Sequence, residues 1–130
     1  MNAIKTAYDA ALPYTTSDRS LVRELLHPEL HGELPLSVSE VVVAPRERTA
    51  LIAHPGSDHV CHVLEGKGFL RAGESFYKVS PRDSVFVPRG TAVQVVNTGD
   101  CFLRVLKFFT PAQAHDETRI VKEDDPPAGP

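Results

Sequence analysis

The sequence has few of the features that define several large classes of protein. Its 130 residues include two cysteines, one methionine and no tryptophan. Cys61 and Cys101 are too few for a disulfide scaffold and lack the paired spacing of a structural zinc site, so we interpret both as buried thiols. No window approaches the run of about 18 apolar residues that a membrane-spanning helix needs. Residues 1–12 have neither a basic start nor the apolar core of a signal peptide, so a cytoplasmic protein is expected.

The chain also lacks a concentration of positive charge. It has 14 Lys and Arg against 17 Asp and Glu, and residues 115–130 account for the whole formal net charge of −3. Nucleic-acid binders obtain much of their affinity from clustered Lys and Arg, and this sequence has no such cluster. We therefore expect neither nucleic acid nor a membrane as a partner. Small-molecule chemistry, small-molecule binding and protein contact remain.

Proline and glycine, which number 11 and 8, divide the chain into short apolar runs. The runs are rich in Val, Phe, Ile and Leu, and turn-forming residues separate them. This spacing is typical of an all-β barrel or sandwich. The expected strands are Ser37–Ala44, Thr49–Ala53, His59–Glu65, Gly68–Ala72, Ser75–Val79, Ser84–Val87, Ala92–Asn97 and Phe102–Phe109.

The chain is expected to form one domain with an extension at each end. Residues 1–35 are a lead-in, in which 21–26 is expected as an edge strand that covers the apolar run at 41–43. Residues 36–111 form the barrel, and 112–130 form an acidic, proline-rich tail whose composition favours disorder. The runs at 41–43, 85–87 and 103–109 are apolar on both parities, so we expect a second sheet or a dimer to cover both faces of those strands.

Two stretches, 54–66 and 81–100, resemble the two-part motif of the cupin family. The first ends in Leu64-Glu65-Gly66, and the second contains Asp83, Pro88, Gly90, Asn97 and Gly99. The resemblance implies a single cupin-type double-stranded β-helix, a jelly-roll barrel, with a mostly apolar cavity between its two sheets. It also implies pairing of two chains as a homodimer.

The family's metal-binding signature is altered in this sequence. That signature has the form H-x-H, then E after three or four residues, with a further His in the second motif. Counted from Gly66, its positions fall on Ile52, His54, His59 and Val93. Ile and Val cannot ligate a metal, so the preferred interpretation requires no cofactor. The alternative is a divalent metal, Zn, Fe, Mn, Ni or Cu, on His54 and His59, with Cys61 as a third ligand from the same strand face as His59.

The preferred function is that of a small-molecule isomerase, cyclase or lyase in which His54 and His59 act as general acid and base. The residues expected to line its pocket are Ile52, Cys61, Val63, Val93 and Val95. The other interpretation is a ligand-binding cupin without catalysis.

One structural feature separates these two interpretations. An enzyme exposes His54 or His59 to the cavity beside an orienting partner such as Asp58, whereas a binding protein seals both rings by packing. We expect His27 and His31 to be solvated. The pattern does not decide which face Arg71, Lys78 and Lys107 occupy.

Overall fold

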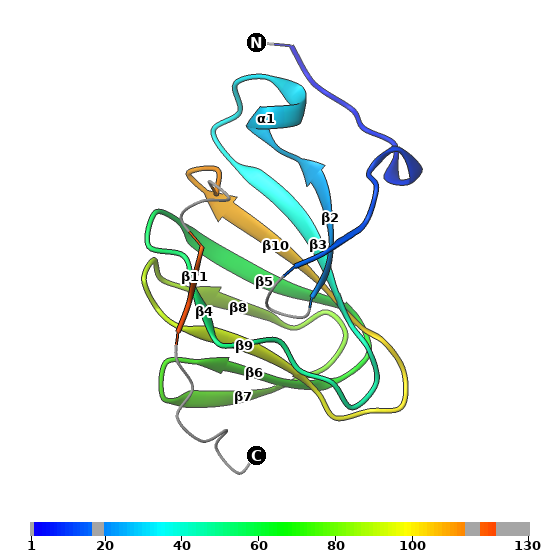
Figure 1. The fold of residues 1–130 in the computed structure, drawn as a ribbon, viewed down its shortest axis with the longest axis vertical. Helices are drawn as coiled ribbons and strands as arrows, with labels where there is room; N and C mark the ends of the chain where they lie inside the picture. The colour runs from blue at the N-terminus through cyan, green and yellow to red at the C-terminus, as the bar shows by residue number, and fades with distance from the viewer. Residues whose placement is uncertain (1, 17–19, 114–117, 122–130) are drawn as a thin grey trace.

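A computed structural model describes residues 2–16, 20–113 and 118–121. Two antiparallel sheets face each other, as the sequence predicts for an all-β fold (Figure 1). In spatial order, the first sheet contains β1 (Tyr14–Thr15), β2 (Leu21–Leu26), β3 (Ser37–Val43), β10 (Leu103–Thr110), β5 (Asp58–Glu65) and β8 (Ser84–Val87). The second contains β11 (Arg119–Ile120), β4 (Ile52–Ala53), β9 (Val93–Asn97), β6 (Gly68–Ala72) and β7 (Ser75–Val79).

The two helical elements of the described residues are short, η1 (Tyr8–Ala10) and α1 (Pro28–His31). Neither was expected from the sequence. None of the described helical segments is long and apolar enough to span a membrane.

All eight expected strands form, with small differences at their ends. The largest difference is at Thr49–Ala53, where only Ile52 and Ala53 pair as β4 and an isolated bridge joins Arg48 to Val96. The expected lead-in strand forms as β2 and pairs antiparallel with β3. It is not an edge strand, because β1 pairs with its other side, and the edges of this sheet are β1 and β8.

The prediction of a tail from residue 112 is wrong at β11. Ile120 pairs with Ile52, and the Val121 amide donates to the Leu51 carbonyl at 2.7 Å. Without β11, the outer edge of β4 would leave backbone groups without partners, and satisfying them stabilises the pairing although the flanking sequence is polar. The rest of the predicted tail, 114–117 and 122–130, lies outside the described residues.

The N-terminal segment covers the outer face of β3. Its Tyr8 hydroxyl donates to the Glu40 carboxylate at 2.5 Å, and the Thr6 hydroxyl donates to the Leu25 carbonyl at 2.8 Å. Every residue of β3 is buried, as the sequence predicts. In β8, Phe86 is 61% exposed on the outer face, so cover of that face would have to come from the predicted dimer. The homodimer stays a prediction.

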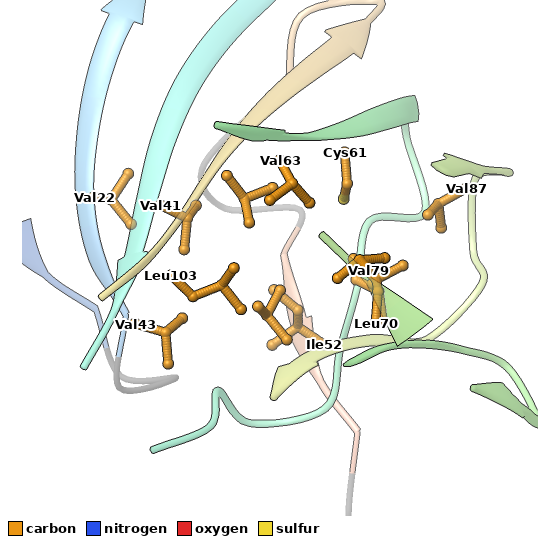
Figure 2. Close-up of a cluster of buried hydrophobic side chains, with 13 residues drawn as sticks. Val22, Val41, Val43, Ile52, Cys61, Val63, Leu70, Val79, Val87 and Leu103 are labelled. Atoms are coloured by element: carbon orange, nitrogen blue, oxygen red, sulfur yellow. The ribbon is translucent and has the colours of Figure 1, made fainter. Parts of the chain in front are cut away.

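The core fills the space between the two sheets (Figure 2). Cys61 belongs to it, but Cys101 is exposed, so the prediction of two buried thiols is wrong for Cys101. The members of the core cluster are Val22, Val41, Val43, Ile52, Cys61, Val63, Leu70, Val79, Val87, Val93, Val95, Leu103 and Val105.

Candidate functional site

A cavity of about 490 Å³ lies beside the core, between β1, β2, β3 and β10 of one sheet and β4 and β11 of the other. Its volume lies in the range of small-molecule sites. Both apolar and polar side chains line it. The lining residues are Tyr14, Thr16, Ser20, Val22, Glu24, Ser39, Val41, Ile52, His54, Lys107, Phe109, Gln113, Thr118 and Ile120.

The register of the first sheet places a charged row on its inner face. Glu24 on β2 lies opposite Ser39 on β3, and Ser39 lies opposite Lys107 on β10. Lys107 shares its parity with Val105 and Phe109, so its side chain enters the cavity wall and is only 4% exposed. The alternation of burial along β10 is visible only in the structure, because residues 103–109 are apolar on both parities and give no sequence signal for the face of this lysine.

The two other cations whose faces the pattern left undecided lie outside the cavity. Arg71 donates to the Gly73 carbonyl at 3.0 Å and lies over the Phe76 ring. Lys78 on β7 is exposed.

A chain of hydrogen bonds orients His54, which directly follows β4. Its Nδ1 lies 3.2 Å from the Thr118 hydroxyl, which accepts a hydrogen bond from the Gln113 side-chain amide. The backbone N–H of Gln113 donates to the Ser37 hydroxyl at 3.0 Å, and the backbone carbonyl of Gln113 accepts from Nε2 of His27 at 2.8 Å. The prediction that His27 is solvated is therefore wrong, because this buried ring holds the segment that positions His54.

His59 contacts His54 but does not line the cavity. The two ring centroids are 5.2 Å apart in an edge-to-face arrangement, and the Phe109 ring lies 4.9 Å from each. His59 is 2% exposed. Within the described part of the chain, neither of its ring nitrogens has a hydrogen-bond partner, and the same holds for Nε2 of His54.

Both imidazoles are neutral at physiological pH. Burial, and to a smaller extent the positive charge of Lys107, lowers the pKa of His54 from 6.5 to about 3. Burial, the positive charge of Lys107 and the electrostatic interaction with the His54 ring lower the pKa of His59 to about 2, against a smaller opposing effect of Asp58. A neutral imidazole offers one hydrogen-bond donor and one acceptor, but it cannot act as a cationic imidazolium acid.

Asp58 does not orient either histidine. Its carboxylate accepts from the Arg89 backbone amide at 2.8 Å and from the Arg89 guanidinium at 3.1 and 3.2 Å. These hydrogen bonds lower the pKa of Asp58. Thr118, which the sequence analysis did not single out, takes the orienting role instead. Nothing in the sequence marks it, because it follows a stretch of polar residues far along the chain from His54.

Of the five residues expected to line a pocket, Ile52 lies in the cavity wall. The other four, Cys61, Val63, Val93 and Val95, lie in the core cluster instead. Val93 still faces Ile52 directly in the pairing of β4 with β9. Position 52 therefore pairs with position 93 across the strands, and the ring at position 54 contacts the ring at position 59.

The model of the cupin domain family matches residues 39–109 of this chain. The chain is a cupin. The matched span runs from β3 to β10 and contains the buried pair His54 and His59 and, on the inner face of the first sheet, Ser39 and Lys107. The segments that contribute Tyr14, Glu24 and Thr118 to the cavity wall lie outside it.

An uncharacterized protein of Methanocaldococcus jannaschii, MJ1618, is 33% identical over 122 residues, which are 94% of this chain and 98% of that protein. Among solved structures, the polyketide cyclase RemF of Streptomyces resistomycificus is similar with a TM-score of 0.76 and 19% identity, over 95% of this chain and 89% of that one. A predicted oxalate decarboxylase of Thermotoga maritima gives a TM-score of 0.73 and 17% identity, over 83% and 99% of the two chains. At this identity the structures share the fold.

The donor set of this cupin does not fit a three-ligand metal site. Across the described ranges, no three His, Cys, Asp or Glu side chains gather closely enough to hold a metal ion. The set His54, His59 and Cys61 is therefore not brought together, and burial raises the pKa of the Cys61 thiol, which disfavours the thiolate that a metal needs. Catalytic zinc sites typically use three protein ligands.

Restoring two imidazoles is expected to create a metal site. Ile52→His together with Val93→His adds two neutral nitrogen donors at paired positions beside His54 and His59. We expect Zn²⁺ to bind at least a hundredfold more tightly, about 2.7 kcal/mol, as measured by isothermal titration calorimetry. The single variant Val93→His is the control and should gain less. A folded double variant with the affinity of the wild type would show that these four positions do not converge.

Proposed function

We propose that this cupin is a small-molecule enzyme of the isomerase, cyclase or lyase type, which moves a proton on a substrate bound in the 490 Å³ cavity. One observation carries the proposal. The cavity wall combines a carboxylate, Glu24, with an imidazole, His54, that a defined hydrogen-bond partner orients. A structural histidine has no need to line a cavity beside an orienting partner.

The pKa of about 3 decides which role His54 takes. At pH 7 its ring is neutral, so it acts as a hydrogen-bond donor to a substrate carbonyl rather than as an imidazolium acid. Glu24 acts as the base. Its carboxylate accepts a hydrogen bond from the Tyr14 hydroxyl at 2.7 Å, which holds it in the wall.

In the proposed step, Glu24 takes a proton from the carbon next to the substrate carbonyl. The electron pair of that C–H bond moves onto the carbonyl oxygen, and the resulting enolate is stabilised by the hydrogen bond from His54. Return of the proton to another carbon gives an isomerase, and loss of a leaving group gives a lyase. The polyketide cyclase RemF and the predicted oxalate decarboxylase, both small-molecule enzymes on this fold, support the class.

The step predicts exchange of carbon-bound hydrogen with solvent. We expect the wild type to accelerate deuterium uptake at the α-carbon of at least one of phenylacetone, 4-phenyl-2-butanone and levulinate in D₂O, as followed by ¹H NMR. His54→Ala and Glu24→Gln should each reduce the rate about a hundredfold, because a positioned donor and a positioned base each contribute on that order. Glu74→Gln, in the exposed turn between β6 and β7, is the matched control and should leave the rate unchanged.

A ligand-binding protein without catalysis is the second candidate, and the packing of His59 favours it. That ring is sealed against Phe109 and His54 and does not line the cavity. Binding of these probes without any acceleration of exchange would support this candidate and contradict the enzyme. Unchanged exchange in both variants would remove Glu24 and His54 from the mechanism.

A further inference from the structure

Lys107 is a buried ammonium group without a counter-ion among the described residues. It is 4% exposed and lies in the wall of the cavity, on the inner face of β10. The ion pairs that the described residues form join other groups: Arg46 with Asp100, Arg89 with Asp58, and Arg104 with Glu40 and Glu65. A charge that is removed from water without a partner is far more costly than a neutral group in the same place.

The groups nearest to Lys107 do not neutralise it. Ser39 lies opposite on β3 and Cys61 opposite on β5. Burial raises the pKa of the Cys61 thiol, so this group stays uncharged at neutral pH. The positive charge of Lys107 lowers the pKa of both His54 and His59, and these rings are neutral as well.

Glu24 is the only carboxylate among the described residues that line this cavity, and it is turned to another partner. It accepts a hydrogen bond from Tyr14. In the sheet, β3 separates β2 from β10, so the backbones of Glu24 and Lys107 are two strand spacings apart, about 10 Å. The cavity therefore has a cation on one side, a carboxylate on the other, and apolar side chains between the sheets.

We propose that this cavity binds the carboxylate of a small organic acid, with the carboxylate on Lys107 and an apolar body against Val22, Val41 and Phe109. This names the substrate class of the proposed enzyme and rests on the proposed function, since it takes the same cavity as the substrate site. One ammonium matches one negative charge. The Glu24 carboxylate in the same wall repels a second charge, so a monocarboxylate fits better than a phosphate monoester.

The test compares charged and neutral ligands of one shape. The probes are cinnamate, its neutral isostere cinnamamide, and phenyl phosphate, and binding is measured by isothermal titration calorimetry at low ionic strength. We expect the wild type to bind cinnamate at least tenfold more tightly than either of the other two. Lys107→Met, which keeps the length of the side chain and removes its charge, should bind cinnamate at least tenfold more weakly and cinnamamide no more weakly.

Lys78→Met is the matched control, because this lysine is exposed on β7 and outside the cavity. It should bind all three probes as the wild type does. A second measurement needs no ligand: since Lys107 has no counter-ion among the described residues, Lys107→Met should raise the thermal midpoint of the free protein. Millimolar cinnamate should raise the midpoint of the wild type but not that of the variant.

Three results would overturn the proposal: equal affinity of the wild type for cinnamate and cinnamamide, tighter binding of phenyl phosphate than of cinnamate, or undiminished cinnamate binding by Lys107→Met. The deuterium-exchange assay distinguishes failure of this carboxylate-binding proposal from failure of the proposed enzymatic function. Charge-selective binding without exchange leaves a carboxylate-binding protein, whereas exchange on neutral ketones without charge selectivity leaves an enzyme whose substrate is not an acid.

Discussion

Acidification below pH 6.5 is expected to destabilise this protein steeply, because two buried histidines must be neutral in the folded state. Their pKa values are about 3 for His54 and about 2 for His59, against 6.5 in the unfolded chain. Between these values the unfolded state binds more protons than the folded state, so protons favour unfolding. The stability that the two neutral rings contribute is therefore complete above pH 6.5 and decreases as the pH falls toward 3.

The expected slope is about 3 kcal/mol per pH unit once the pH is well below 6.5, since each histidine contributes about 1.4 kcal/mol. Single domains have total stabilities of roughly 5–15 kcal/mol, so the fold should be lost within a few pH units. The measurement is the free energy of unfolding in urea at intervals from pH 8 to pH 4.5.

The control for this prediction is the double variant His54→Leu with His59→Leu, compared with its own stability at pH 8. Its free energy of unfolding should change much less between pH 6.5 and 4.5. Asp58 does not interfere, because its pKa is lowered from 3.8 and its contribution is lost only at lower pH. An equally steep decline in the double variant would assign the acid sensitivity to other groups.

Gly66→Ala is expected to cost roughly 3–5 kcal/mol of stability. This glycine directly follows β5 and has a φ of +83°. That left-handed conformation costs free energy for any residue that carries a Cβ. A Cβ built there would lie 2.4 Å from the Phe102 carbonyl oxygen and 2.9 Å from the Leu103 Cα. Because both are backbone atoms, the start of β10 would have to move.

Gly90→Ala is the matched control for Gly66→Ala. Gly90 has nearly the same φ, +79°, but a Cβ there meets no atom within 4 Å among the described residues. It should lose only the cost of the left-handed conformation, about 1–2 kcal/mol in urea unfolding at pH 7.5. The difference between the two variants isolates the close approach of backbones. Equal losses would mean that the contact with Phe102 is not part of the fold in solution.

Much of the fold follows from local sequence. Proline and glycine at the turns, with Val, Phe, Ile and Leu between them, are sufficient to locate the strands between 37 and 109, because turn residues act through their own φ and ψ. The short helix Pro28–His31 was missed, since its capping group is a histidine side chain, which accepts from the Glu29 amide. Histidine is not among the usual capping residues.

The site was predicted less completely than the fold. His54 and Ile52 lie in the cavity wall, and His54 contacts His59 as the register from Gly66 implies. Other polar wall residues, among them Tyr14, Glu24 and Thr118, were missed because they come from segments on either side of the barrel sequence. No periodicity in one segment indicates which residue of another segment it will face.

The sequence by itself determined the all-β class, the position of the strands and the family, since each depends on residue type and spacing within short stretches. The tertiary structure alone decided that Lys107 is buried, that Thr118 rather than Asp58 orients His54, and that β11 pairs with β4. Those three facts are contacts between residues far apart in the chain. The free energy of each contact depends on which neighbours exclude water and which supply a hydrogen bond. Only the packing of the two sheets determines those neighbours.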